Sequence, residues 1–479
     1  MKKTLLSLSF LLGLGLQGYS QTFTPQNSTL APDYQFQSIQ AIDANTAWGL
    51  AGTVVGTSLN ANTYVRTSNG GTTWQGGIIS PTGLSGYTAG GMYALDANTA
   101  WAAMYHGSDG TGLIAKTTDG GATWVPQTTP GAATTPGVQF GSPNGFANWV
   151  HFFDAQNGVC QGDPNRTATS SVNFFELYTT NNGGTTWTRV PRTANNTPLN
   201  ANEYGVVSQY YAVGNTVWFT TLFQGGTGAP PITTPSRVFK STDRGLTWVA
   251  PASTGIPTSV SGIAFAGDAQ HGLAYDGTGN LVRSNDGGAT WAPQAYSTPF
   301  HRYDVSGVRG TNAFVSAGLD GRVTTPTANT EFGISISTDF GATWKDIDTG
   351  TSYTAISFAS PSVGYAGGFS STTGGGAIGK YTGSNVLSNR NTELQKSLSV
   401  YPNPSSNGIF TVQLASGLKS GASVRVFDVV GRQVAAQTLN ATAIAAKATT
   451  VDLSNEKAGI YTLELRTEAG VAQQKLVVE

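Results

Sequence analysis

Short apolar stretches recur along most of the chain, and a turn rich in Gly, Asn or Asp separates each from a second stretch of small and apolar residues. Alternating stretches of this length, bounded by turn residues, predict antiparallel β-strands. The pattern occurs seven times. The first strands are expected at 38–42, 92–95, 149–153, 206–211, 262–266, 305–308 and 355–358, and the second at 47–52, 100–103, 158–161, 217–221, 272–275, 313–318 and 364–368.

Six of these units continue into an eight-residue box with the form Ser/Thr, any residue, Asp/Asn, any residue, Gly, two residues, Trp. We expect the Asp or Asn to accept backbone N–H bonds from two or three residues on, the Gly to have positive φ, and the Trp to be buried under the hairpin. The boxes therefore predict structural staples. Their key residues are Asn69, Gly71, Trp74, Asp119, Gly121, Trp124, Asn182, Gly184, Trp187, Asp243, Gly245, Trp248, Asp286, Gly288, Trp291, Asp339, Gly341 and Trp344.

The six boxes resemble Asp-box (BNR) repeats, the hairpin signature of β-propellers in sialidases, sortilin-like receptors and photosystem II assembly factors. The resemblance implies a propeller and no particular activity. The seventh unit lacks a box, whereas residues 22–26 repeat the strand that follows the boxes at 123–127 and 290–294. We predict that this N-terminal strand completes the seventh blade, with Phe23 in place of Trp, in an all-β, seven-bladed propeller spanning 21–382.

The two ends of the chain differ from the repeats. Lys2 and Lys3 precede an apolar stretch at 5–16, which predicts a signal peptide over 1–20. Because no later segment reaches about 18 apolar residues, no transmembrane segment is expected in the mature chain. After the propeller, 383–395 is a polar linker.

Residues 396–479 contain about seven short strands with alternating polarity, which predicts a small C-terminal β-sandwich. Val-Tyr-Pro-Asn-Pro at 400–404, the segment 428–432 and Gly-Ile-Tyr at 459–461 resemble the type A C-terminal sorting domain of the type IX secretion system. The resemblance implies that the type IX machinery is a partner. It also implies delivery through the periplasm to the outer cell surface or the exterior.

Charge and cysteine content narrow the function. Lys+Arg 25 against Asp+Glu 26 gives a net charge of −1, which argues against a nucleic-acid partner. The single cysteine, Cys160, lies in an apolar stretch and is expected to be a buried core residue. The four histidines have no metal-ligand spacing, so we predict no metal and no cofactor.

Candidate ligand-binding residues lie in the loops expected at the end of the propeller opposite the boxes. Charged residues make up only 11% of the chain, which makes their gathering there notable. The candidates are Asp163, Arg166, Asp276, His301, Arg302, Asp320 and Arg322. They favour a non-catalytic recognition or scaffold module for a glycan, a protein or an extracellular polymer. Assembly-factor-like chaperoning of a membrane complex rests on analogy alone.

The alternative is a glycoside hydrolase acting in the propeller funnel. The sialidase resemblance implies an arginine clamp and a Tyr/Glu nucleophile pair, which Glu203 with Tyr204 or Tyr303 could supply. However, the Arg-Ile-Pro motif of sialidases is absent, and the repeat region holds only three glutamates. A two-carboxylate hydrolase would use Asp163, Asp276 or Asp320.

Overall fold

A computed structural model describes most residues of the chain. These are 22–55, 58–132, 138–141, 145–165, 174–198, 202–223, 235–257, 259–319, 332–370, 374–383, 394–395, 398–414, 422–428, 433–467 and 470–479. Arg166, Asp320, Arg322 and the predicted signal peptide lie outside them.

Five separate four-stranded antiparallel sheets form much of the N-terminal domain, and each follows chain order from its first strand to its fourth. The first two are β6 (Tyr87–Ala94), β7 (Ala100–His106), β8 (Gly112–Thr117), β9 (Val125–Pro126), and β10 (Ala147–Phe152), β11 (Gly158–Asn165), β12 (Phe174–Thr180), β13 (Thr188–Arg189). The next are β14 (Glu203–Val213), β15 (Thr216–Phe223), β16 (Arg237–Ser241), β17 (Ala252–Ser253), and β18 (Gly262–Phe265), β19 (Gly272–Tyr275), β20 (Leu281–Ser284), β21 (Ala292–Pro293). The fifth is β22 (Asp304–Gly307), β23 (Phe314–Gly318), β24 (Gly333–Ser337) and β25 (Lys345–Thr349).

An eight-stranded sheet holds the two ends of the domain. Its strands are β1 (Phe23–Asn27), β2 (Tyr34–Ala41), β3 (Ala47–Val55), β4 (Ser58–Thr67), β5 (Gln75–Ile78), β26 (Tyr353–Ser360), β27 (Val363–Ser370) and β28 (Gly376–Tyr381). Its two halves are joined by the single pairing of Gln35 with Phe369. Dividing the sheet there gives two further groups of four strands, and the count of seven blades rests on this division.

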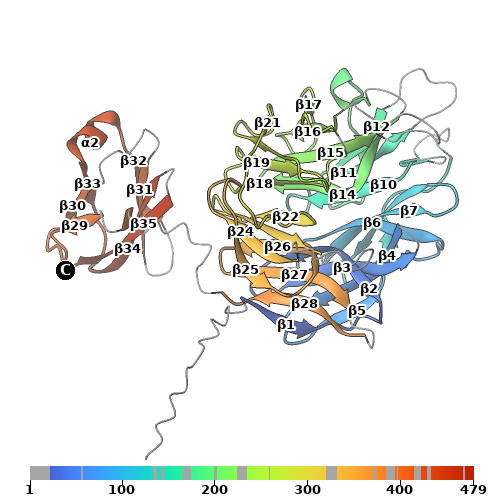
Figure 1. Cartoon of the computed structure of the whole chain (residues 1–479), viewed down its shortest axis with the longest axis horizontal. Helices are drawn as coiled ribbons and strands as arrows, with labels where there is room; N and C mark the ends of the chain where they lie inside the picture. Colours follow the sequence, from blue (N-terminus) through green and yellow to red (C-terminus); the bar gives the residue numbers. More distant parts are fainter. Residues whose placement is uncertain are drawn as a thin grey trace, which may run out of the picture.

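The first strands of the groups form a closed ring, in which β2, β6, β10, β14, β18, β22 and β26 pack in order and β26 packs against β2. Figure 1 shows the sheets arranged around this common centre. The domain is therefore a β-propeller, as predicted. Cys160 on β11 is buried, as predicted, and burial raises the pKa of its thiol well above the usual value.

The predicted closure of the ring by the N-terminal strand is confirmed. Strand β1 pairs antiparallel with β28, from Phe23 opposite Tyr381 to Asn27 opposite Ala377. Phe23 is fully buried, and its ring centroid lies 5.4 Å from that of Tyr381 and 6.0 Å from that of Tyr353. The first and last strands of the domain therefore share one apolar core.

The boxes form tight hairpins whose hydrogen bonds differ in register from the expected ones. Asp119 Oδ1 accepts the N–H of Thr123, four residues on rather than two or three, at 2.9 Å. The Thr117 hydroxyl oxygen accepts the N–H of Gly121 at 2.8 Å, and Gly121 has the expected positive φ of 94°. The other five boxes repeat both bonds. The pKa of Asp119 is lowered to about 2 by hydrogen bonds from the Thr123 hydroxyl, the Thr123 N–H and the Thr117 hydroxyl.

The box indoles are buried as expected, except for that of Trp291, which is half-buried. The boxes also contact the turn between the first and second strands of their own blade. The N–H of Gly70 donates to Asn45 O at 2.8 Å, and the N–H of Gly120 donates to Asn98 O at 2.9 Å. We call this end of the propeller the box face and the opposite end, which carries the links between blades, the loop face.

The C-terminal domain contains two sheets, as predicted. One is β29 (Ser399–Tyr401), β30 (Ile409–Gln413) and β33 (Ala448–Asp452), and the other is β31 (Ser423–Phe427), β32 (Gln433–Thr438), β34 (Gly459–Thr467) and β35 (Gly470–Val478). Phe410, Val426 and Leu463 are among the fully buried residues of their shared core.

Two short helices were not predicted. They are η1 (Ala194–Asn196) in the propeller and α2 (Ala441–Ala446) in the C-terminal domain. Asn440 caps α2 by accepting the N–H of Ala443, and Lys447 ends the helix in the left-handed conformation. A capped stretch this short shows no apolar periodicity, which is why the sequence pattern did not reveal it.

The closing strand generates a stability prediction. We expect Phe23→Ala to destabilise the propeller by about 3–5 kcal/mol, because it removes a fully buried aromatic side chain from the core that joins the chain ends. Thr24→Ala changes an exposed neighbour on the same strand and should cost little. Denaturant unfolding of the two variants checks this, and equal midpoints would contradict the closure role.

Candidate functional site

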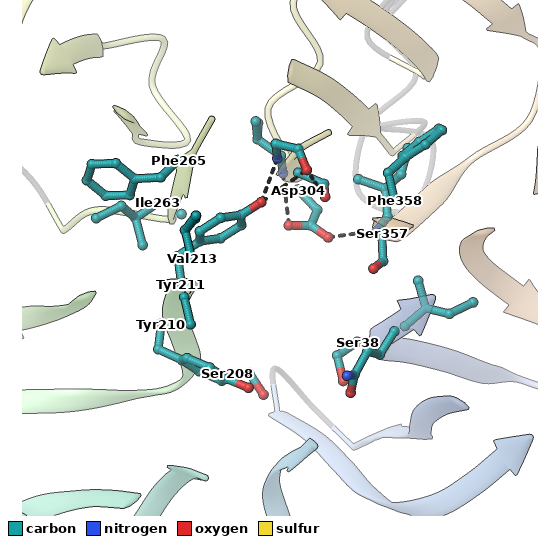
Figure 2. Close-up of a pocket in the computed structure, with 18 of the residues that line it drawn as sticks. Ser38, Ser208, Tyr210, Tyr211, Val213, Ile263, Phe265, Asp304, Ser357 and Phe358 are labelled. Carbon is teal, nitrogen blue, oxygen red and sulfur yellow. Dashed lines mark hydrogen bonds between the residues drawn. The ribbon is translucent and has the colours of Figure 1, made fainter. Parts of the chain in front are cut away.

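The ring of first strands encloses a central cavity of about 600 Å³. All seven first strands contribute to its lining. Figure 2 shows side chains from several blades converging on this space. The volume lies in the range of sites for small ligands, so the cavity is the candidate functional site.

The first strand of each blade has one edge without a partner strand. Side chains from other blades form hydrogen bonds with backbone N–H and C=O groups on these edges. The Tyr211 hydroxyl group donates to Gly307 O at 3.1 Å and accepts the N–H of Gly307 at 2.9 Å (Figure 2). The Gln40 amide makes the corresponding pair of bonds with Ala94, at 2.9 and 2.8 Å. These contacts tie neighbouring and more distant blades together and leave fewer backbone groups for a ligand.

Asp304 is the one carboxylate among the described residues that line the cavity. Its Oδ2 accepts the N–H of Ile356 at 2.7 Å, and its Oδ1 accepts the N–H of Val305 at 2.8 Å. Burial raises its pKa to about 6, although the two N–H bonds oppose the rise. This carboxyl group therefore changes charge close to neutral pH.

An aromatic wall formed by Tyr93, His151 and Tyr210 lines part of the cavity. The His151 ring lies edge-on, 4.6 Å from Tyr93 and 5.6 Å from Tyr210 between centroids. Burial and the charge of Arg309 lower the pKa of His151 to about 3, so its imidazole is neutral at physiological pH. Trp149 stacks behind Tyr210 at 4.7 Å and holds the wall in place.

An irregular segment of β14 crosses toward another blade. The pairing of β14 with β15 shifts register between Gly205 and Tyr210, and Ser208 within the shift has a positive φ of 57°. The Ser208 hydroxyl donates to Gly90 O on β6 at 2.8 Å, beside the Gln37 amide, which donates to the same oxygen at 2.6 Å. This bulge therefore links the inner strands β14 and β6 through a side chain.

Of the predicted loop residues, the four that the structure describes, Asp163, Asp276, His301 and Arg302, are not among the residues that line the cavity. Asp163 accepts hydrogen bonds from Asn148 Nδ2 at 2.9 Å and from the N–H of Gly205 at 3.0 Å, which connects two blades. Asp276 is 1% exposed and accepts the N–H groups of Thr278 and Asn280 within its own turn.

His301 and Arg302 lie near the start of β22. His301 is 1% exposed, and its Nε2 lies 2.9 Å from Asp346 Oδ1. The Arg302 guanidinium lies against Gly279 in the Asp276 turn, so the structure brings these two predicted regions together. Asp163 lies with other blades. Asp304, two residues beyond Arg302, is the cavity residue that sequence reasoning missed.

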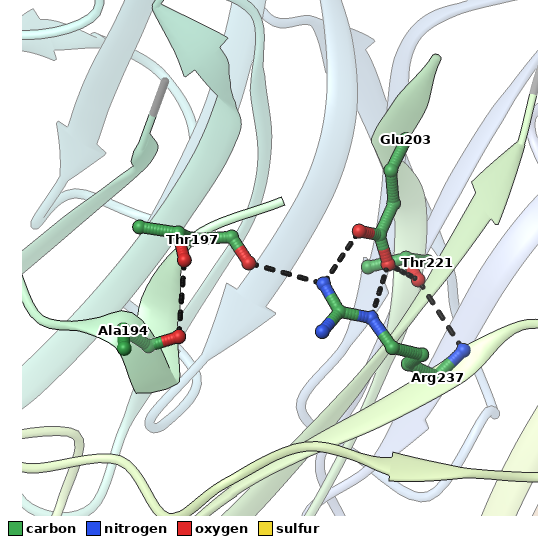
Figure 3. Close-up of polar contacts among 5 residues, drawn as sticks. All are labelled: Ala194, Thr197, Glu203, Thr221 and Arg237. Carbon is green, nitrogen blue, oxygen red and sulfur yellow. Dashed lines mark hydrogen bonds and ion pairs between the residues drawn. The ribbon is translucent and has the colours of Figure 1, made fainter. Parts of the chain in front are cut away.

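The glutamates considered for catalysis are held in buried ion pairs. Glu203 is fully buried, and Arg237 Nε and Nη2 donate to its two carboxylate oxygens at 2.8 and 2.5 Å (Figure 3). The Thr221 hydroxyl also donates to Glu203, at 2.6 Å. Glu176 is equally buried and pairs with Arg189 at 2.7 Å. Glu331 lies outside the described residues.

In the described part of the chain, no group of three His, Cys, Asp or Glu side chains is arranged to hold a metal ion. Over the same residues, no helix has the length and apolar character needed to cross a membrane.

Comparison with known families identifies the C-terminal domain. Residues 399–479 match the model of the secretion system C-terminal sorting domain. The molecule is thus a β-propeller protein that carries a secretion signal in its C-terminal domain. More particularly, the tail is a type IX sorting domain, and the protein is secreted to the cell surface or the exterior.

The propeller has distant structural relatives. YCF48 bound to D1 peptide is 16% identical with a TM-score of 0.48, covering 76% of this chain and 98% of that one. YCF48 from Cyanidioschyzon merolae is 14% identical with the same TM-score, covering 75% and 98%. A GH74 xyloglucanase from Xanthomonas campestris is 14% identical with a TM-score of 0.30, covering 97% and 68%. No curated protein matches the chain.

The raised pKa of Asp304 generates a pH prediction. The folded protein keeps this proton up to about pH 6, whereas an unfolded Asp loses it near 3.9. The contribution of Asp304 to stability therefore falls as pH rises from about 4 to 6, by roughly 2 kcal/mol at this half-buried site. Asp304→Asn should remove that fall.

Denaturant unfolding at pH 4, 5, 6 and 7 measures the effect. Burial also raises the pKa of Asp348 to about 6, and this group gives the same slope in both proteins. Only the difference between wild type and Asp304→Asn is therefore diagnostic. Parallel stability curves for the two proteins would show that Asp304 does not titrate as described.

Proposed function

We propose that the protein is a non-catalytic recognition module that acts outside the cell and binds a glycan in its central cavity. The observation that carries the proposal is the presence of a single carboxylate, Asp304, among the described lining residues. Glycoside hydrolysis ordinarily needs two carboxyl groups flanking the bond. Because Glu176 and Glu203 are committed to buried ion pairs, they do not supply the second.

The lining chemistry supports a glycan as the ligand. Aromatic faces pack against the apolar faces of sugar rings, while amide and hydroxyl groups exchange hydrogen bonds with sugar hydroxyls. The cavity offers both kinds of group, with Tyr93 and Tyr210 on one side and Ser38 and Gln209 elsewhere in the lining. Ser38 points toward the cavity in Figure 2.

The described residues among the predicted loop candidates have a secondary role in the proposed glycan binding. Arg302 directly precedes Tyr303 and Asp304, which line the cavity. We propose that Arg302 borders the loop-face opening and contacts longer ligands. Asp163, Asp276 and His301 shape that rim through the contacts described above.

A glycoside hydrolase is the second candidate, and one observation favours it. A carboxyl group with a pKa near 6 is suited to act as a general acid at neutral pH, and Asp304 has this property. The proposal therefore has to be tested with a readout that separates retention of a sugar from its release.

Export generates the first functional prediction. Deleting residues 398–479 removes the sorting domain, so we expect the truncated propeller to remain in the periplasm. Cell fractionation with protease treatment of intact cells measures its location. Detection of the truncated chain at the surface would contradict dependence on this domain.

Glycan binding generates the second functional prediction. On a glycan array, we expect the full chain to be retained without releasing sugar. Tyr210→Phe removes one phenol hydroxyl at the cavity wall and should weaken retention about twofold to tenfold. Arg302→Gln, outside the cavity, should have a smaller effect on short glycans.

The same experiment distinguishes the alternatives. Sugar release that is lost in Asp304→Asn would establish the hydrolase and overturn the non-catalytic assignment. Absence of both retention and release across the array would contradict a glycan ligand and leave a protein or another polymer as the partner class.

A further inference from the structure

Arg309 differs from the other arginines of the propeller. It lies in the turn after β22, at the box-face end of the central cavity, and it is exposed. Within the described part of the chain it makes no hydrogen bond or ion pair. The other described propeller arginines each contact a partner group; they are Arg66, Arg189, Arg192, Arg237, Arg244, Arg283 and Arg302.

Three side chains that line the cavity together with Arg309 have unused hydrogen-bonding capacity. Burial raises the pKa values of the Tyr93 and Tyr210 hydroxyl groups, so both remain O–H donors at neutral pH. His151 between them is neutral. None of these three side chains makes a hydrogen bond within the described residues, although all line the cavity.

The charge of Arg309 acts on two of these side chains, His151 and Tyr93, and on the neighbouring Tyr211. It lowers the pKa of His151, second to burial, and it opposes the rise in the pKa values of Tyr93 and Tyr211. Among the described lining residues, the box-face end therefore holds one cation and several donors but no carboxylate. The charge of Asp154 also reaches Tyr93, but Asp154 does not line the cavity and pairs with Arg244 at 3.0 Å. An arrangement of this kind stabilises an anionic group from a ligand.

We propose that the box-face end of the cavity binds the carboxylate of an acidic sugar, with Arg309 as its counter-charge and Tyr93 and Tyr210 as further donors. This inference rests on the proposed glycan-binding function and names the class of sugar. A guanidinium group presents two parallel N–H donors that match the two oxygens of a carboxylate.

The opposite end of the cavity restricts the ligand to one acidic group. Asp304 begins β22, which ends at Gly307, and Arg309 lies in the turn beyond, so the strand alone separates Asp304 from the box-face end by about 10 Å. Above pH 6 the Asp304 carboxylate repels a second anion. The cavity thus favours an acidic sugar flanked by neutral sugars over a uniformly charged polyanion.

The test is calorimetric titration of the full chain with an oligosaccharide that contains one glucuronic acid, and with the same oligosaccharide after reduction of its carboxyl group. Wild type should bind the acidic form roughly tenfold to a hundredfold more tightly. Arg309→Gln should abolish this preference and keep binding of the reduced form. Arg309→Lys should retain part of the preference, since the charge remains without the paired donors.

Arg192→Gln removes the same charge at an exposed position that does not line the cavity, and it is the matched control. It should keep the preference for the acidic form. Equal affinity of wild type for the two forms, or an unchanged preference in Arg309→Gln, would overturn the carboxylate site while leaving glycan recognition intact. Binding of neither form by wild type would overturn the glycan-binding proposal as well.

Discussion

The structure depends on hydrogen bonds to the backbone groups along the unpaired edge of each innermost strand. In a sheet whose first strand faces a central cavity, one row of backbone N–H and C=O groups has no partner strand. Here side chains of other blades supply partners, as Tyr211 does for Gly307 and Asp304 does for Ile356. The same contacts hold the blades together around the cavity. Some polar side chains that line the cavity do not take part in these contacts and are available to a ligand. They are chiefly those of Tyr93, His151 and Arg309.

The repeat pattern and the closure of the ring could be predicted from the sequence because both depend on local signals. A box closes through its own residues, so Asp119 and Gly121 behave alike in any blade that carries the pattern. Phe23 could be placed because its neighbours repeat the strand that follows other boxes. Only the hydrogen-bond register inside the box, four residues rather than two or three, needed the structure.

The residues that line the cavity could not be predicted, because the inner strands are irregular. Register shifts occur at Phe36/Ser38 on β2, at Ala89/Gly91 on β6 and at Gly205/Tyr210 on β14. A shift reverses which side chains face the centre, so alternation along the sequence does not identify the lining. Polar residues in loops also did not identify the ligand site. The carboxylate of Asp276, for example, accepts hydrogen bonds from its own turn. Asp304 was not among the predicted ligand-binding residues, because it lies at the start of an apolar strand.

The joining of the chain ends in one blade also has a mechanical consequence. The backbone N–H of Thr382 donates to Thr22 O at 2.8 Å, just beyond the pair formed by Phe23 and Tyr381. The chain continues from this point toward the sorting domain. Tension applied through that domain therefore reaches the closing pair first and opens it bond by bond from this end. The strand pair that completes the ring therefore also bears the load of a pull from the propeller's own secretion signal.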